Sequence, residues 1–165
     1  MRKSLLLSLL VALFIPILFA GCDNVLEPLV PLQNNEVRVS VADYGSFDSF
    51  PVTVSTDATS WRLQANDNAA PDSIVITLWI PRQTSAPYTV TVQNNNIARI
   101  NYCVQINHTC TDFDVYDGHG NGTITVNSID ETNHIVSGTF NGSLVQLNGN
   151  PGTKTLSNGE FKFVY

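Results

Sequence analysis

The chain has 165 residues and a formal net charge of -6, and only 13% of its residues are charged. This length suits one ordinary domain with a sizeable core and leaves little room for a second. Eight basic residues against 14 acidic ones exclude the clustered Lys and Arg that nucleic acid or an anionic lipid surface requires of a partner.

The first segment has the features of an export signal. Two cations precede an apolar run from Leu5 to Phe19, which is short for a membrane span and is interrupted by Pro16. The run ends in the letters FAGC, residues 19–22, which resemble the lipobox of bacterial lipoproteins, although Leu is usual where this chain has Phe. We therefore expect residues 1–21 to be a lipoprotein signal peptide and Cys22 to carry the lipid, with acyl chains such as palmitate. The alternative is an ordinary secretory signal followed by a chance Cys.

Residues 22–35 contain two prolines and show no hydrophobic period, so they are expected to form a lipidated tether. Loss of residues 1–21 removes two cations and leaves 6 basic against 14 acidic residues, a formal charge of -8. The domain is then expected over residues 36–165, held in the bacterial cell envelope, periplasmic or at the outer membrane or cell surface.

From residue 36 onward apolar and polar residues alternate with a period of two, as in half-buried antiparallel strands. The clearest runs are 37–41, 74–80, 88–92, 136–144 and 161–165, and clusters of Asn, Gly and Pro separate them. No part of this region shows a convincing helical period. The pattern predicts an all-β domain of about nine or ten strands, either a single antiparallel β-sandwich or a partly open β-barrel.

Two tryptophans are candidate ligand contacts, because exposed aromatic rings on a β surface can stack on sugars or anchor a protein partner. Trp79 is predicted on the outward face of its strand beside Val75 and Thr77, and Trp61 lies in a polar stretch. In the other interpretation, which we favour, a second sheet or the N-terminal segment covers Val75 and Trp79, so that this strand is buried on both faces.

A short motif at the start of the same strand indicates a possible modification. Asp72-Ser73-Ile74 resembles the Asp-Ser/Thr-apolar site at which Bacteroidota attach O-glycans to exported proteins. Ser73 is therefore a candidate for O-glycosylation, although a pattern of three residues has little specificity.

After lipidation of Cys22, an even number of cysteines remains for an oxidising compartment, namely Cys103 and Cys110. A turn centred between residues 106 and 107 would set Cys103 directly opposite Cys110. The same register would set Tyr102 opposite Thr111 and Ile100 opposite Phe113. We therefore predict a Cys103–Cys110 disulfide on the outer face of a hairpin.

An acidic cluster follows the second cysteine and contains the weak metal candidates Asp112, Asp114, Asp117 and Asn121. Calcium loops use such ligands around a glycine turn, but the EF-hand spacing is missed by one residue here. We interpret Asp112 and Asp114 as the solvent face of a strand, with Asp117 in the turn that follows it. A glycosidase pair of carboxylates lacks the apolar pocket that would raise one pKa. No metal and no cofactor are expected.

The C-terminal third resembles a family of lipoprotein domains of the Bacteroidota that have no assigned activity. That family ends in a "GTITI" strand, an acidic turn, "ISGTF", a variable hairpin and a final "TNGxF" strand. The matching segments here are 122–126, Asp130, 136–140 and 157–165. The resemblance implies location and fold and lends no catalytic residue.

Independently of that family, Gly138 and Gly142 share a face with Phe140, where a missing side chain allows close packing. Asn158-Gly159 is predicted to turn the chain into its last strand.

The sequence indicates a non-catalytic binding or scaffolding domain of a cell-envelope lipoprotein. Its membrane contact would be the lipid on Cys22, and its partner an unknown envelope protein or glycan. One alternative is a glycan-binding module that uses an exposed Trp. The other is a hydrolase built across loops, which is disfavoured because all three histidines fall in predicted turns and no G-x-S-x-G elbow is present.

Overall fold

A computed structural model of the chain describes residues 30–49, 51–67, 73–92, 98–106, 109–115, 120–146 and 152–165. The chain divides into two compact units, Met1–Pro31 and Leu32–Tyr165. Of the first unit only residues 30–31 are described, so the expected signal peptide and Cys22 lie outside the described residues. In the described part of the chain, no helix is long and apolar enough to cross a membrane.

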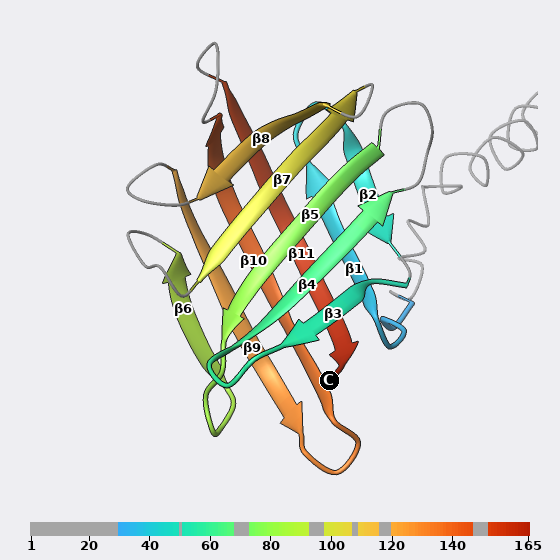
Figure 1. Ribbon diagram of the computed structural model, residues 1–165, viewed down its shortest axis with the longest axis vertical. Coiled ribbons are helices and arrows are strands. Elements are labelled where there is room, and N and C mark those ends of the chain that lie inside the picture. The colour runs from blue at the N-terminus through green and yellow to red at the C-terminus, as the bar shows by residue number, and fades with distance from the viewer. Residues whose placement is uncertain are drawn as a thin grey trace, which may run out of the picture. The chain divides into compact units, whose positions relative to one another are not determined.

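The second unit is all-β (Figure 1). Its described residues form eleven strands and no helix, and every strand pairing is antiparallel. The strands are β1 (Glu36–Val41), β2 (Gly45–Ser49), β3 (Thr53–Thr56), β4 (Ser60–Asp67), β5 (Ser73–Pro81), β6 (Tyr88–Val92), β7 (Arg99–Ile106), β8 (Thr109–Val115), β9 (Asn121–Asp130), β10 (Ile135–Gln146) and β11 (Thr153–Val164).

The strands lie in two facing layers, as Figure 1 shows. The first, here called the β4–β5 layer, has the order β3-β4-β5-β7-β8. The second, the β10–β11 layer, has the order β2-β1-β11-β10-β9-β6. The predicted all-β antiparallel sandwich is therefore confirmed, with one strand more than the upper expectation.

The two layers are joined at one corner by the long strand β10. Its first part pairs with β9 over Ile135–Ser143, and its last two residues pair with β8 instead. The hydrogen-bonded path runs from β2 at one end to β3 at the other, and the sheet does not close into a barrel. The β4–β5 layer therefore keeps an outward surface that the other layer does not cover.

The core fills the space between the layers and follows the alternation of the sequence. One continuous cluster of buried apolar side chains takes the inward residues of nearly every strand. From the β4–β5 layer it includes Trp61, Leu63, Ile76, Leu78, Ile100 and Tyr102; from the other layer it includes Val37, Val39, Val136, Phe140, Phe161 and Phe163. Burying these side chains is the main favourable contribution to folding, at about 1.5–3 kcal/mol for each large one.

The pairing of β10 with β11 depends on two glycines that let aromatic rings lie against the backbone. A Cβ at Gly138 would overlap the carbonyl oxygen of Thr125 and lie 2.5 Å from the Phe161 ring. A Cβ at Gly159 would lie 2.7 Å from the ring of Phe140. The close packing predicted at Gly138 is therefore confirmed.

The turn predicted at Asn158-Gly159 is wrong. Both residues lie inside the continuous strand β11, and the register of β11 against β10 shifts between Phe140 and Gly142. Asn158 has a φ of 52°, so the left-handed residue serves a bulge in a strand and not a hairpin turn. Asn-Gly favours a positive φ in a hairpin turn and in a bulge alike. The pairing of the flanking strands therefore decides which of the two forms.

Candidate functional site

The outward surface of the β4–β5 layer carries a row of four side chains at one level of the sheet. Strand pairing sets Ser55 opposite Arg62, Arg62 opposite Trp79, and Trp79 opposite Arg99. Side chains alternate between the two faces of a sheet, and the residues flanking Arg62, Trp79 and Arg99 are buried in the core, so these three side chains point away from it. The exposed Ser55 shares their face because it is paired with Arg62. We call Ser55, Arg62, Trp79 and Arg99 the cationic row.

The centre of the cationic row is an indole flanked by two guanidinium groups. The guanidinium carbon of Arg62 lies 4.8 Å from the centre of the Trp79 ring, and that of Arg99 lies 5.1 Å from it. The two arginines reach the ring from the two strands that neighbour β5. Each such cation–π contact is worth about 0.5–1 kcal/mol at an exposed site and restricts the side chain's orientation. Trp79 is half-buried as a result.

The interpretation that another sheet or the N-terminal segment covers this face is corrected by these contacts. Thr77 is only 4% exposed, but Val75 and Trp79 stay partly exposed. Arginine side chains from β4 and β7 provide the cover for Trp79 among the described residues. The strand is therefore buried on one face and half-covered on the other.

The next level of the same face has neutral polar residues on β3, β4, β5 and β7, and Asp114 of β8 is opposite the last of them. Thr53 pairs with Gln64, Gln64 with Thr77, and Thr77 with Asn101. Thr53 and Gln64 are exposed and Asn101 is half-buried. Hydroxyl and amide groups that both donate and accept hydrogen bonds therefore adjoin the two guanidinium groups.

The turn between β3 and β4 fixes the residues that start β4. One carboxylate oxygen of Asp57 accepts hydrogen bonds from the backbone N–H groups of Thr59 and Ser60, both at 2.7 Å. The other accepts one from the Ser60 hydroxyl at 2.8 Å. These bonds, the Ser60 hydroxyl first, lower the pKa of Asp57 from 3.8 to about 2. The next two residues are Trp61 and Arg62, so this turn positions a core residue and a cationic-row residue together.

Trp61 lies on the inward face of β4, one position from Arg62. It is 2% exposed, and its ring packs 5.9 Å from Phe163 and 5.4 Å from Tyr165 between ring centres. The exposed Arg82 lies above it, with its guanidinium carbon 5.2 Å from the Trp61 ring centre. The buried indole N–H of Trp61 has no hydrogen-bond partner among the described residues. Trp61 is therefore a core residue, and the polar stretch around it reflects only the outward positions of β4.

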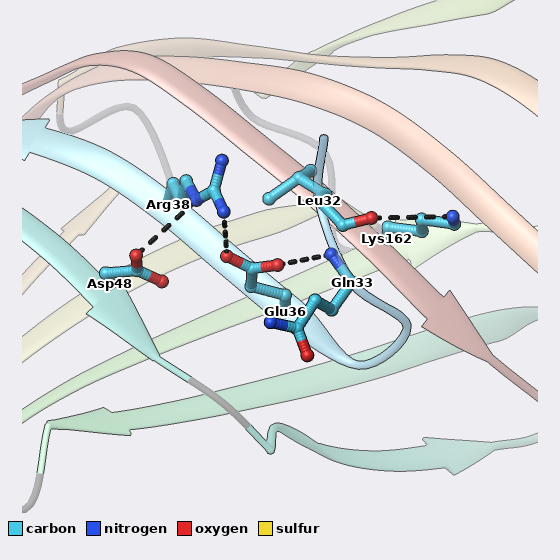
Figure 2. A network of polar contacts seen from close by, with 6 residues as sticks. All are labelled: Leu32, Gln33, Glu36, Arg38, Asp48 and Lys162. Atoms are coloured by element: carbon cyan, nitrogen blue, oxygen red, sulfur yellow. Dashed lines mark hydrogen bonds and ion pairs between the residues drawn. The ribbon is translucent and has the colours of Figure 1, made fainter. Parts of the chain in front are cut away.

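A second polar cluster lies where the domain begins, around the buried carboxylate of Glu36 (Figure 2). Glu36 is 3% exposed and accepts hydrogen bonds from the backbone N–H of Gln33 and from the guanidinium of Arg38, the latter at 2.5 Å. Lys162 on the neighbouring strand donates to the backbone carbonyl of Leu32 at 3.5 Å. The chain from residue 32 onward is thus attached to β1 and β11, before the first strand starts.

Arg38 links this cluster to Asp48 on β2. The Arg38 Nε atom lies 3.5 Å from the Asp48 carboxylate, and the two residues are directly paired across the strands. Partial burial, followed by the charge of Glu36, raises the pKa of Asp48. Glu36 and Asp48 therefore share one guanidinium, and we interpret the cluster as structural.

The register predicted for the cysteine hairpin is wrong by two residues. β7 and β8 pair so that Cys103 is opposite Asp112, Tyr102 is opposite Phe113, and Ile100 is opposite Val115. The strands stay paired up to residues 106 and 109, which moves the turn centre by one residue and every pairing by two.

The shift keeps the parity of the strand, so Ile100 and Tyr102 are buried in the core as predicted. Cys103 was predicted on the outer face, yet it is only 4% exposed. Cys110 is opposite Gln105, which makes it a diagonal neighbour of Cys103. The side chain of Cys110 lies outside the described residues, and the disulfide stays a prediction.

The remaining predicted site residues are only partly described. Ser73 starts β5 opposite Gln105, and its side chain lies outside the described residues. The same holds for the side chains of Asp112 and Asp114 in β8 and for all of Asp117, whereas Asn121 is exposed at the start of β9. Among the described residues, no group of three or more His, Cys, Asp or Glu could hold a metal ion.

Comparison with protein-family models, with curated proteins and with solved structures gives no significant match. The cationic row is therefore defined by geometry alone. Sequence reasoning missed Arg62 and Arg99 because neither belongs to a motif. The available signal was alternation: Arg62 lies between Trp61 and Leu63, and Arg99 lies between Ala98 and Ile100, so both must point outward if their neighbours are buried.

Proposed function

We propose that this chain is a lipid-anchored protein of the bacterial cell envelope and that its β-sandwich is a non-catalytic binding domain. The cationic row on the outward face of β4, β5 and β7 is its binding face. The observation that carries the proposal is the placement of Trp79 between Arg62 and Arg99, because guanidinium groups ordered by an aromatic ring are pre-oriented to bind a ligand.

The titratable groups of the described residues support a binding role over a catalytic one. The carboxyl groups with a shifted pKa each have a structural explanation: Asp48 pairs with Arg38, Asp57 holds the β3–β4 turn, and Asp130 holds the β9–β10 turn. None of these carboxylates lies on the cationic row. A hydrolase would instead require converging acid and base groups in one place.

The attachment of residues 32–36 to the domain supports the anchor. A tether from Cys22 would join the sandwich at Leu32 and Gln33, where Lys162 and Glu36 hold the chain. The tether would thus end at a fixed point of the domain.

Lipidation is tested by mass spectrometry of the mature protein. We expect residues 1–21 to be absent and Cys22 to be acylated, and the Cys22→Ser chain to be released from membranes. Cleavage at another position with a free thiol on Cys22 would contradict the anchor and leave the binding face untouched.

The binding face is tested by hydrogen–deuterium exchange of the mature protein with soluble polysaccharide prepared from bacterial envelopes. We expect protection in peptides that cover β4, β5 and β7, and loss of that protection in Trp79→Ala. Protection confined to other strands, or none at all, would contradict the proposal. Shortening of the polysaccharide during incubation would indicate the hydrolase instead.

The Cys103–Cys110 disulfide belongs to the same proposal, since it would close the hairpin next to the binding face. Cys103 is buried, as a bonded cysteine would be. Diagonal neighbours on paired strands are about 7–8 Å apart at Cα and somewhat closer at Cβ, so the bond requires the two strands to move slightly together.

A further inference from the structure

We infer that the free edge of β6 pairs with β6 of a second copy of this chain, so that the β10–β11 layers of two copies form one continuous antiparallel sheet. This self-association goes beyond the proposed binding function and does not rest on it.

β6 is paired on one side only. It ends the order β2-β1-β11-β10-β9-β6, and all five of its residues, Tyr88–Val92, pair with β9. Among the described residues, no backbone hydrogen bond reaches β6 from a second strand or from a loop. Figure 1 shows β6 as the outermost strand of its layer, next to β9. Alternate N–H and C=O groups of β6 therefore point away from β9 and can pair with an added strand.

β6 also lacks the features that usually prevent edge-to-edge pairing, which are charge, proline, a bulge or very short length. The other strands with a free edge have them: β2 contains Asp48, β8 contains Asp112 and Asp114, and β3 has only four residues. The residues of β6 are YTVTV, and its register with β9 has no shift. The hydroxyls of Thr89 and Thr125 are hydrogen-bonded at 2.9 Å, which holds the strand against β9. β6 is thus an ordered edge without protection.

The alternation of β6 is self-complementary. An antiparallel pairing centred on Val90 sets that residue opposite its own copy and Tyr88 opposite Val92, so that inward side chains meet inward ones. It also sets Thr89 opposite Thr91, both of which are exposed on the outward face. A centre between two residues would instead set inward side chains opposite outward ones, which the period of two excludes. The pairing about Val90 is two-fold symmetric and supplies about four to six backbone hydrogen bonds.

The described charges of this layer lie far from the β6 edge. β6 and β10 contain no charged residue, and β9 contains only Asp130, beyond the residues that pair with β6. Across the outward face from Thr89, the first charged residue is Glu160 on β11. It is three strands away, or about 14 Å, which exceeds the Debye length of about 8 Å at physiological ionic strength. Two acidic copies of the chain therefore repel each other little when they meet at β6.

The small size of the contact predicts a weak dimer. Five residues from each copy bury less than the about 1,200 Å² that stable complexes usually reach. The two-fold axis of this pairing is perpendicular to the sheet, so the inward faces of both sheets lie on one side. The outward surfaces of the two β4–β5 layers would therefore face the same direction.

Self-association is tested by sedimentation equilibrium of the Cys22→Ser chain from about 10 μM to about 1 mM, a range that reveals weak contacts. We expect a monomer–dimer equilibrium. Thr89→Lys combined with Thr91→Lys should weaken the dimer at least about tenfold, because each new Lys is opposite a Lys of the other copy. Thr53→Lys combined with Ser55→Lys makes the same charge change at exposed positions of β3 and should leave the dimer unchanged. In the Cys22→Ser chain itself, amide exchange in a peptide covering β6 should slow as the concentration rises.

Each other outcome contradicts the inference in a defined way. Monomers at every concentration, with unchanged exchange in β6, would leave this edge to an extended segment of another protein. A dimer that persists in the β6 double variant would place the contact elsewhere, and equal weakening by both double variants would show a general charge effect. Assemblies larger than dimers would contradict a two-fold contact. The exchange measurement needs no substitution, so it decides the test if the melting temperature shows that the β6 double variant fails to fold.

Discussion

Trp61 and Trp79 lie on the same two paired strands, yet the molecule uses them in opposite ways. Trp61 is opposite Ile80 on the inward face, where it is 2% exposed and packs against Phe163 and Tyr165. Trp79 is opposite Arg62 on the outward face, where two guanidinium groups lie against its ring. The same residue type therefore builds the core at one position and orders cations at the next.

The difference teaches how a small sandwich separates stability from recognition. The inward face must exclude water and pack closely, so its residues are constrained by their neighbours in the other layer. The outward face has no such constraint. Holding two arginine side chains against the half-buried Trp79 ring without a ligand costs only side-chain entropy. The predictions below test this division between the two faces.

The largest expected effect is on stability, from removing the inward ring. Trp61→Ala should lower the free energy of unfolding by about 3–5 kcal/mol, as for other large-to-small changes in a core. Trp79→Ala should lower it by only about 1–2 kcal/mol, since it loses two exposed cation–π contacts. Chemical denaturation of both variants measures the difference. Equal losses of unfolding free energy in the two variants would contradict the distinction between the inward and outward faces.

The second prediction concerns Cys103, which is on the outward side of β7 but is buried. Reduction of the Cys103–Cys110 bond should lower the free energy of unfolding by roughly 2–3 kcal/mol, because it frees a short loop in the unfolded chain. Thiol alkylation of the unreduced, denatured mature protein should label neither cysteine. Labelling of both cysteines would rule out the bond. The diagonal placement of Cys103 and Cys110 would then result from strand pairing alone.

A third prediction tests the inward face of the other layer at Gly138. Gly138→Ala should cost about 1–3 kcal/mol or more, because the new Cβ meets the Thr125 carbonyl and the Phe161 ring and a backbone atom cannot easily move. Thr139→Ala, on the exposed neighbouring position, should cost under about 1 kcal/mol. The melting temperatures of the two variants test this prediction. A Gly138→Ala variant as stable as the native chain would mean that the layers are loosely packed.

The smallest effect is a pH dependence at Asp57, whose turn positions both Trp61 and Arg62. The folded pKa of about 2 is below the ordinary value of 3.8, so the stabilisation is present above pH 3.8 and is lost as pH falls toward 2. The melting temperature of the native chain should therefore exceed that of Asp57→Ala at neutral pH and approach it between about pH 4 and pH 2. A constant difference over that range would contradict the proposed role of the carboxylate.

The alternation of the sequence was sufficient to predict the strands that build the core. Val37, Val39 and Val41 are buried on β1, and Phe161 and Phe163 are buried on β11, as a period of two requires. Short strands were not predictable in the same way. β2 and β3 have five and four residues, too few to show a period, and they form because β1 and β4 offer them a partner.

Neither the register of β7 against β8 nor the binding face could be predicted from the sequence, for a related reason. Pairing β7 with β8 as predicted or as observed buries Ile100 and Tyr102 equally well, so the pattern could not distinguish turns that differ by one residue. The cationic row depends on β5 lying between β4 and β7, which brings together residues 37 positions apart in the chain. Local alternation indicates that Arg62 and Arg99 point outward, but no local signal shows that both lie beside Trp79.

The most direct test of a binding face on the outward side of β4, β5 and β7 is to observe both tryptophans at once. The chain has two tryptophans, so a nitrogen–proton correlation spectrum of the Cys22→Ser chain should contain two indole N–H signals. The signal lost in Trp79→Phe identifies the outward ring. We predict that soluble envelope polysaccharide shifts the Trp79 signal and leaves that of Trp61 in place. A shift of the Trp61 signal alone, or of neither, would contradict the account.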